Sequence, residues 1–229
     1  MPSILFHEFI GYKIAKKYPI YDTNNFYLGL MVPDSVNAYG FASKEDRWRT
    51  HVRDENLDIW EENIINFYKD NKGKYEQTYL MGYVVHVLTD IICDRIYQTE
   101  LYPKLLEKGF DYHSAYSFYE KGIEQFENSN INEKWWEDAK IKFQNAEIFS
   151  ISDMSEKMIF DEIQYTINKY SSRFYEKPGF ITDEFAKKVV SGIEKTEILW
   201  GDMYLKNKVW IKFELLQFCN SSNFILKNK

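Results

Sequence analysis

A histidine and an aspartate lie four residues apart in the otherwise apolar stretch from Gly82 to Asp90. At helical spacing, the side chains of His86 and Asp90 project from the same face. Imidazole nitrogens and carboxylate oxygens are zinc ligands, and pairs with this spacing hold metal on helices. A buried histidine hydrogen-bonded to a carboxylate would have the same spacing, so the pair alone leaves both interpretations open.

Three more residues with suitable side chains lie upstream of this pair. His7 lies in an apolar N-terminal stretch, Asp34 directly follows Pro33, and His51 follows a threonine. Proline restricts the backbone and favours a turn or a helix start, so we expect Asp34 on a stiff corner beside buried apolar residues. A carboxylate there would also suit a helix N-cap. The candidate metal ligands are therefore His7, Asp34, His51, His86 and Asp90.

The apolar residues recur at spacings of three and four with little strict alternation, which predicts an all-α fold. The expected helices cover about 3–18, 54–70, 75–98, 112–127, 135–143, 153–176 and 182–200. Between the first two we expect a long connection over 21–43, and we expect His51 to open the helix over 54–70. Segment 75–98 is the least polar and should be central. We expect a single domain over 1–229, with the metal site in about 1–110 and completing helices over 111–229.

Composition excludes several classes of protein. With 229 residues, of which 45% are hydrophobic and 28% charged, the chain can bury a core and does not resemble a disordered protein. A net charge of -6 with scattered lysines argues against nucleic acid as a partner. The two cysteines form no Cys-x-x-Cys pair, and no apolar window is long enough to span a membrane. Because the first residues lack the basic region of a secretory signal, we expect a cytoplasmic protein.

In their order and spacing, these motifs resemble the zinc-dependent phospholipase C family, which includes the bacterial phosphatidylcholine-hydrolysing enzymes and clostridial alpha-toxin. The resemblance covers about the first hundred residues. It rests on an early histidine, a Gly-x-x-x-Pro-Asp element, a Thr-His pair and Gly-Tyr-x-x-His-x-x-x-Asp. It implies the helical fold of phospholipase C and P1 nuclease. It also implies that Asp34, His51, His86 and Asp90 bind one zinc ion, and that His7 and a bridging Asp90 bind part of a second.

The resemblance implies a metal-dependent phosphoesterase, in which zinc-activated water attacks a phosphodiester and Asp34 assists the proton transfer. Its partner would be a phosphate-ester small molecule or a lipid headgroup. The secreted enzymes also use an N-terminal tryptophan, a later histidine pair and a glutamate as ligands. Here the remaining histidine is His113, which lacks the expected acidic companion. We therefore expect one or two zinc ions and no third site.

Two other interpretations stay open. An HD-type phosphohydrolase is also helical and uses histidine and aspartate ligands, but no histidine of this chain is directly followed by aspartate. A helical scaffold or binding module would keep the polar cluster for structural reasons, with or without zinc, and would hydrolyse no phosphate ester.

Overall fold

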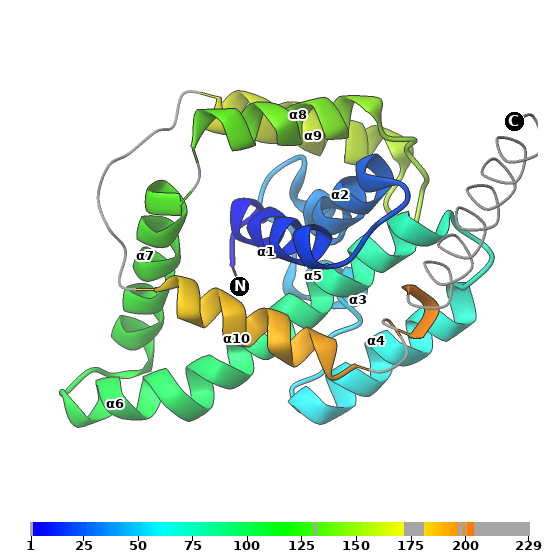
Figure 1. Ribbon diagram of the computed structural model, residues 1–229. Coiled ribbons are helices and arrows are strands. Elements are labelled where there is room, and N and C mark those ends of the chain that lie inside the picture. The colour runs from blue at the N-terminus through cyan, green and yellow to red at the C-terminus, as the bar shows by residue number, and fades with distance from the viewer. Residues whose placement is uncertain (1, 131, 172–180, 197–198, 200, 204–229) are drawn as a thin grey trace, which may run out of the picture. The chain divides into compact units, whose positions relative to one another are not determined.

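The computed structural model describes residues 2–130, 132–171, 181–196, 199 and 201–203 (Figure 1). The described residues form helices and no strands, which confirms the all-α prediction. The elements are α1 (Ile4–Lys17), α2 (Thr23–Met31), η1 (Val32–Asn37), α3 (Lys44–Thr50), α4 (Leu57–Asn71), α5 (Gln77–Ile96), η2 (Tyr97–Leu101), α6 (Tyr102–Glu107), α7 (Tyr112–Asn130), α8 (Glu133–Asn145), α9 (Glu156–Tyr170) and α10 (Asp183–Glu194). None of the described helices combines the length and the apolar character needed to cross a bilayer.

The chain divides into a compact unit, Met1–Ile193, and a second segment, Glu194–Lys229. The first unit contains α1 to α9 and nearly all of α10. Most of the second segment lies outside the described residues, so the expectation of a single domain over 1–229 stays a prediction. The candidate metal ligands all belong to the first unit.

Helix α5 is the centre of the first unit. Every side chain from Thr78 to Ile91 is buried, so α5 is covered on all of its faces. A helix of this kind is stable only where other helices surround it, and α1, α2, α4 and η1 all pack against it. The predicted central position of this segment is confirmed. His86 and Asp90 therefore lie in the protein interior.

Helices α2 and α5 cross at two glycines. A Cβ atom added to Gly29 would lie 2.1 Å from the carbonyl oxygen of Tyr79, and one added to Gly82 would lie 2.1 Å from that of Phe26. The two backbones thus approach more closely than any larger residue would allow. This crossing places the end of α2 directly against the face of α5 that carries His86.

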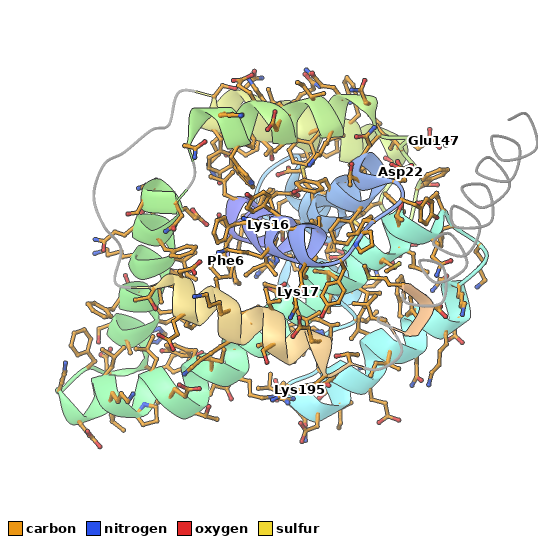
Figure 2. The ribbon with its side chains drawn as sticks, viewed as in Figure 1. Phe6, Lys16, Lys17, Asp22, Glu147 and Lys195 are labelled. Atoms are coloured by element: carbon orange, nitrogen blue, oxygen red, sulfur yellow. The ribbon has the colours of Figure 1, made fainter. Side chains whose placement is uncertain are left out.

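Two expectations about the first third of the chain are wrong. The segment 21–43 is not a long connection, because it contains the buried helix α2 and the short helix η1. Asp22 caps α2 by accepting hydrogen bonds from the backbone N–H groups of Asn24 and Asn25, and Figure 2 shows it at the start of this helix. His51 does not open a helix, because it is the C-cap of α3, and α4 begins only at Leu57.

The later helices cover the first half of the chain. Phe126 of α7 makes edge contacts with Phe6 and Phe9 of α1, with ring centroids 5.7 and 5.2 Å apart. Helix α8 packs on α2, and α9 packs on η1. Aromatic side chains thus join the helices to each other. The contact between α9 and η1 closes one side of the corner that carries Asp34.

The α2–α5 crossing predicts that Gly82→Ala lowers the free energy of unfolding by about 3 kcal/mol, because the two helices would have to separate. Gly201→Ala is the matched control, since a Cβ atom there meets nothing within 4 Å. Urea unfolding followed by circular dichroism measures both variants. Equal stabilities for the two variants would contradict the close crossing.

Candidate metal centre

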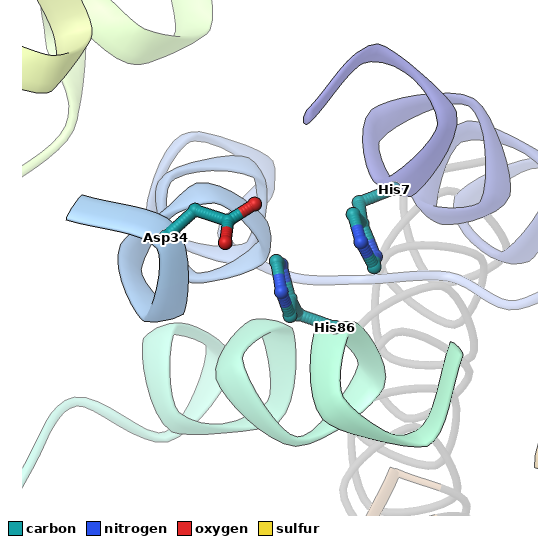
Figure 3. Close-up of side chains that lie close together, drawn as sticks. All are labelled: His7, Asp34 and His86. Carbon is teal, nitrogen blue, oxygen red and sulfur yellow. The ribbon is translucent and has the colours of Figure 1, made fainter. Parts of the chain in front are cut away.

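The five candidate ligands come from four elements and meet in one cluster. His7 comes from α1, Asp34 from η1, His51 from the end of α3, and His86 and Asp90 from α5. Figure 3 shows His7, Asp34 and His86 approaching from three directions. Four of the five side chains are fully buried, namely those of His7, His51, His86 and Asp90. That of Asp34 is 14% exposed. Asp34 is therefore the member of the cluster that solvent reaches.

Backbone carbonyls fix the protonation of two imidazole rings. His51 Nδ1 lies 2.8 Å from the carbonyl oxygen of Arg47, and His86 Nδ1 lies 2.6 Å from that of Leu30. A carbonyl oxygen only accepts, so each Nδ1 carries a hydrogen. Burial lowers the pKa of His86, so this ring is neutral and has a lone pair on Nε2. Burial also acts to lower the pKa of His51, but its contact with Asp34 and the charges of Asp90 and Asp34 outweigh burial and raise it. The two Nε2 atoms are 3.2 Å apart. At this distance, either a hydrogen on His51 Nε2 or a shared cation lies between the two nitrogens.

The local sequence makes these two carbonyls available. Pro33 lacks an N–H group, so it cannot donate to the carbonyls of the last turn of α2, which includes Leu30. The carbonyl of Arg47, in the last turn of the short helix α3, accepts from the backbone N–H of His51 and from the Thr50 hydroxyl, and also from His51 Nδ1. In each case a helix end supplies the acceptor that orients one histidine.

Asp90 is a buried carboxylate without a hydrogen-bond donor among the described residues. Its Oδ1 lies 3.4 Å from His7 Nε2, and its Oδ2 lies 3.6 Å from His51 Nε2 and 3.7 Å from His86 Nε2. Neither ring nitrogen of His7 has a hydrogen bond in the described structure. The His7 ring stacks on the His86 ring, with the two ring centroids 3.6 Å apart. An unpaired charge in such an interior costs several kcal/mol. A bound cation removes this cost.

The spacing of the donor atoms fits zinc. Ligand atoms of a tetrahedral zinc ion lie about 3.3 Å from one another, and the contacts among the nitrogen and oxygen atoms of this cluster run from 3.2 to 3.7 Å. Two overlapping groups have geometry suited to one ion each. They are His7 with Asp34 and His86, and His51 with His86 and Asp90. His86 belongs to both groups, so the five predicted residues form a single cluster.

The charges of the cluster also suit a metal at neutral pH. Burial, helped by the charge of His7, lowers the pKa of His86 to about 3, so this ring is neutral. Burial alone would raise the pKa of Asp90, but His7 and the other two histidines hold it well below its usual value. The pKa of Asp34 is lowered against burial in the same way, chiefly by its contact with His51. Both carboxylates are therefore charged and ready to bind a cation.

Two cavities meet at Asp34. The α9 cavity, of about 410 Å³, lies between η1 and α9 and includes Glu162 and Tyr165 in its wall. The α3 cavity, of about 520 Å³, includes Lys44 and Arg47 in its wall. Asp34, Asn37 and Phe41 line both cavities. A substrate held at Asp34 could thus extend in two directions.

Glu162 is a residue of this region that sequence reasoning missed. It is buried on α9 and accepts a 3.4 Å hydrogen bond from Thr166. Burial and the charge of Asp34 raise its pKa to about 7, so it holds a proton at slightly acidic pH. The only sequence signal was its position on the apolar face of an amphipathic segment, where an acid is costly. Such a carboxyl is suited to proton transfer near neutral pH.

Comparison with known proteins assigns no family. No family model matches the chain, and neither the curated proteins nor the solved structures contain a match. The resemblance to zinc-dependent phospholipase C therefore stays a prediction, which rests on the motifs.

The cluster predicts that protein purified without chelator contains one or two equivalents of zinc per chain. His86→Gln should lose this metal, because both candidate groups include His86. His113→Gln is the matched control, since His113 is exposed on α7. Elemental analysis of the purified proteins measures the content. A wild-type protein that stays free of metal after incubation with zinc would contradict the metal centre.

The position of Glu162 predicts a pH dependence of stability in the protein stripped of metal. Its pKa rises from an ordinary value of 4.5 to about 7 on folding, so the native state keeps a proton that the unfolded chain releases. The free energy of unfolding should therefore fall by about 3 kcal/mol as the pH rises through this window. Glu162→Gln should remove this part of the slope. Urea unfolding at a series of pH values tests it, and equal slopes for both proteins would refute it.

Proposed function

We propose that this protein is a metal-dependent phosphoesterase that hydrolyses a phosphodiester with zinc-activated water. The observation that carries the proposal is the convergence of buried nitrogen and oxygen atoms. The Nε2 atoms of His51 and His86 and the Asp90 carboxylate lie 3.2 to 3.7 Å from one another. The two Asp90 oxygens accept no hydrogen bond from the described residues. Nitrogen and oxygen ligands of this kind suit zinc, iron and manganese, and the resemblance to zinc-dependent phospholipase C favours zinc.

The chain's own residues would divide the work as follows. His51, His86 and Asp90 would hold zinc, and His7 with Asp34 would complete the site or bind a second ion. When bound, zinc lowers the pKa of a coordinated water to about 7 and stabilises negative charge on phosphate oxygens. Asp34 would accept the proton of the attacking water, because it is charged and is the exposed member of the cluster. The products would be a phosphomonoester and an alcohol.

The two cavities support a diester as the substrate. A phosphodiester has two organic arms, and Asp34 lies where two separate cavities meet. Each cavity is within the size range of small-molecule sites. Glu162, in the wall of the α9 cavity, would donate a proton to a departing oxygen on that side. The substrate would be a soluble phosphate ester or a lipid headgroup, and a cytoplasmic location stays a prediction.

A structural metal site is the second candidate. It is favoured by the complete burial of four of the five ligands, which is typical of zinc sites closed to solvent. In that case the metal would add to the stability of the fold, and the protein would act as a helical scaffold or binding module. Zinc-dependent turnover of a phosphate ester separates the two candidates.

The proposed role of Asp34 predicts that Asp34→Asn lowers the kcat of zinc-dependent hydrolysis of bis(p-nitrophenyl) phosphate by about 10²- to 10⁴-fold. At least one equivalent of zinc should remain, because His51, His86 and Asp90 are unchanged. Asp58→Asn, which alters only an exposed ion pair with Arg95, is the control. Full activity of Asp34→Asn would refute its role as a base. A wild-type protein with bound zinc and no phosphoesterase activity would refute the proposed function.

A further inference from the structure

The α3 cavity has a cationic wall beside the metal centre. Lys44 and Arg47 of α3 and Arg53 of the following turn line it, together with Asp34. Glu120 also lines the cavity. It is the one acid in the described lining besides the candidate ligand Asp34, so the three cations outnumber it. A cavity with an excess of one charge attracts a ligand of the opposite charge. The distribution of charge in the cavity therefore favours an anionic group.

Two of these cations are held by aromatic rings and not by acids. The Lys44 amine lies 4.2 Å from the ring centroid of Trp48, and the Arg47 guanidinium carbon lies 4.1 Å from that of Phe41. Neither cation forms an ion pair with any described residue. Stacking on a ring restricts a cationic side chain without neutralising its charge. Both side chains are thus positioned and still available to an anion.

Arg53 adds a fixed hydrogen-bond donor. Its Nη2 donates a 2.8 Å hydrogen bond to Asp94, and its guanidinium carbon lies 4.3 Å from the ring centroid of Trp60. Its Nε is buried and has no acceptor among the described residues. Buried donors are nearly always paired, and a planar guanidinium matches the oxygens of a phosphate group. The unused donor therefore indicates a ligand with phosphate-like oxygens.

We propose that the α3 cavity binds a second phosphate group of the substrate, separate from the one at the metal centre. The substrate class is then an ester that carries two phosphates, either a soluble bisphosphate or a phosphorylated lipid headgroup. This inference rests on the proposed function, because the metal centre holds the first phosphate. It explains why the wall combines three cations with a cavity that opens onto Asp34.

Calorimetric titration of the zinc-loaded protein with glucose 1,6-bisphosphate and glucose 1-phosphate tests the proposal without any turnover. The bisphosphate should bind about tenfold more tightly or better, because charge-assisted hydrogen bonds hold its second phosphate. The preference should disappear in the Lys44→Gln, Arg47→Gln double variant. Arg49→Gln is the control, because Arg49 lies on the same helix, pairs with Asp46 and Asp153, and does not line this cavity.

The outcomes separate this inference from the proposed function. Equal affinities of the two probes for the wild-type protein would overturn the second phosphate site, even if bis(p-nitrophenyl) phosphate is hydrolysed. A preference that survives the double variant would also overturn it. A preference that depends on Lys44 and Arg47 in a protein without phosphoesterase activity would support the phosphate site and refute the proposed function.

A second experiment identifies whether the phosphate belongs to a lipid or to a soluble molecule. Vesicles of phosphatidylcholine, with and without phosphatidylinositol 4-phosphate, are sedimented with the zinc-loaded protein. Cosedimentation that requires the phosphorylated lipid and Lys44 with Arg47 supports the site as one for a lipid headgroup. Selective binding of the bisphosphate without cosedimentation supports it for a soluble substrate.

Discussion

The Asp90 carboxylate is charged inside the protein and accepts no hydrogen bond from the described residues. Such a group is stable only if a cation or several partly positive groups surround it. The three histidines that approach it come from α1, α3 and α5, so these elements must pack around one point. The close crossing of α2 over α5 brings the supporting carbonyl of Leu30 to the same place. The packing of these helices and the formation of the site therefore depend on each other.

The ends of short helical elements around the site orient its histidine side chains. The last turns of α2 and α3 supply the carbonyl oxygens of Leu30 and Arg47, which accept from the two histidines. Each carbonyl accepts from one Nδ1 atom, so the corresponding Nε2 is the ring nitrogen that faces the cluster. The short helix η1, which directly follows α2 and contacts α3, carries Asp34 to the edge of the cluster. The interruption of helical structure at Pro33 and at His51 thus orients the ligands and opens the site to solvent.

The spacing of His86 and Asp90 was enough to predict their common face, because periodicity and apolar context are local properties of a sequence. Local patterns could not define α2, which has a polar first turn and contains Gly29 near its end. This helix depends on the cap at Asp22 and on burial by other helices. Nor could they find α3, which is only seven residues long and mostly polar. Glu162 lies 72 residues beyond Asp90 in the sequence and joins the site only through the packing of α9 on η1. Contacts between distant segments decide such positions, and no single-sequence pattern encodes them.

The end of α3 shows how strain is used beside the site. Val52 has a φ of 44°, in the left-handed region that usually requires glycine. The N–H of Arg53 donates to the carbonyl of Trp48, and that of Val52 donates to the carbonyl of Arg49, which together form a Schellman motif. A β-branched residue there costs about 1–2 kcal/mol. This motif fixes His51 on one side of Val52 and Arg53 on the other, so one strained residue sets the spacing between the metal centre and the cationic wall.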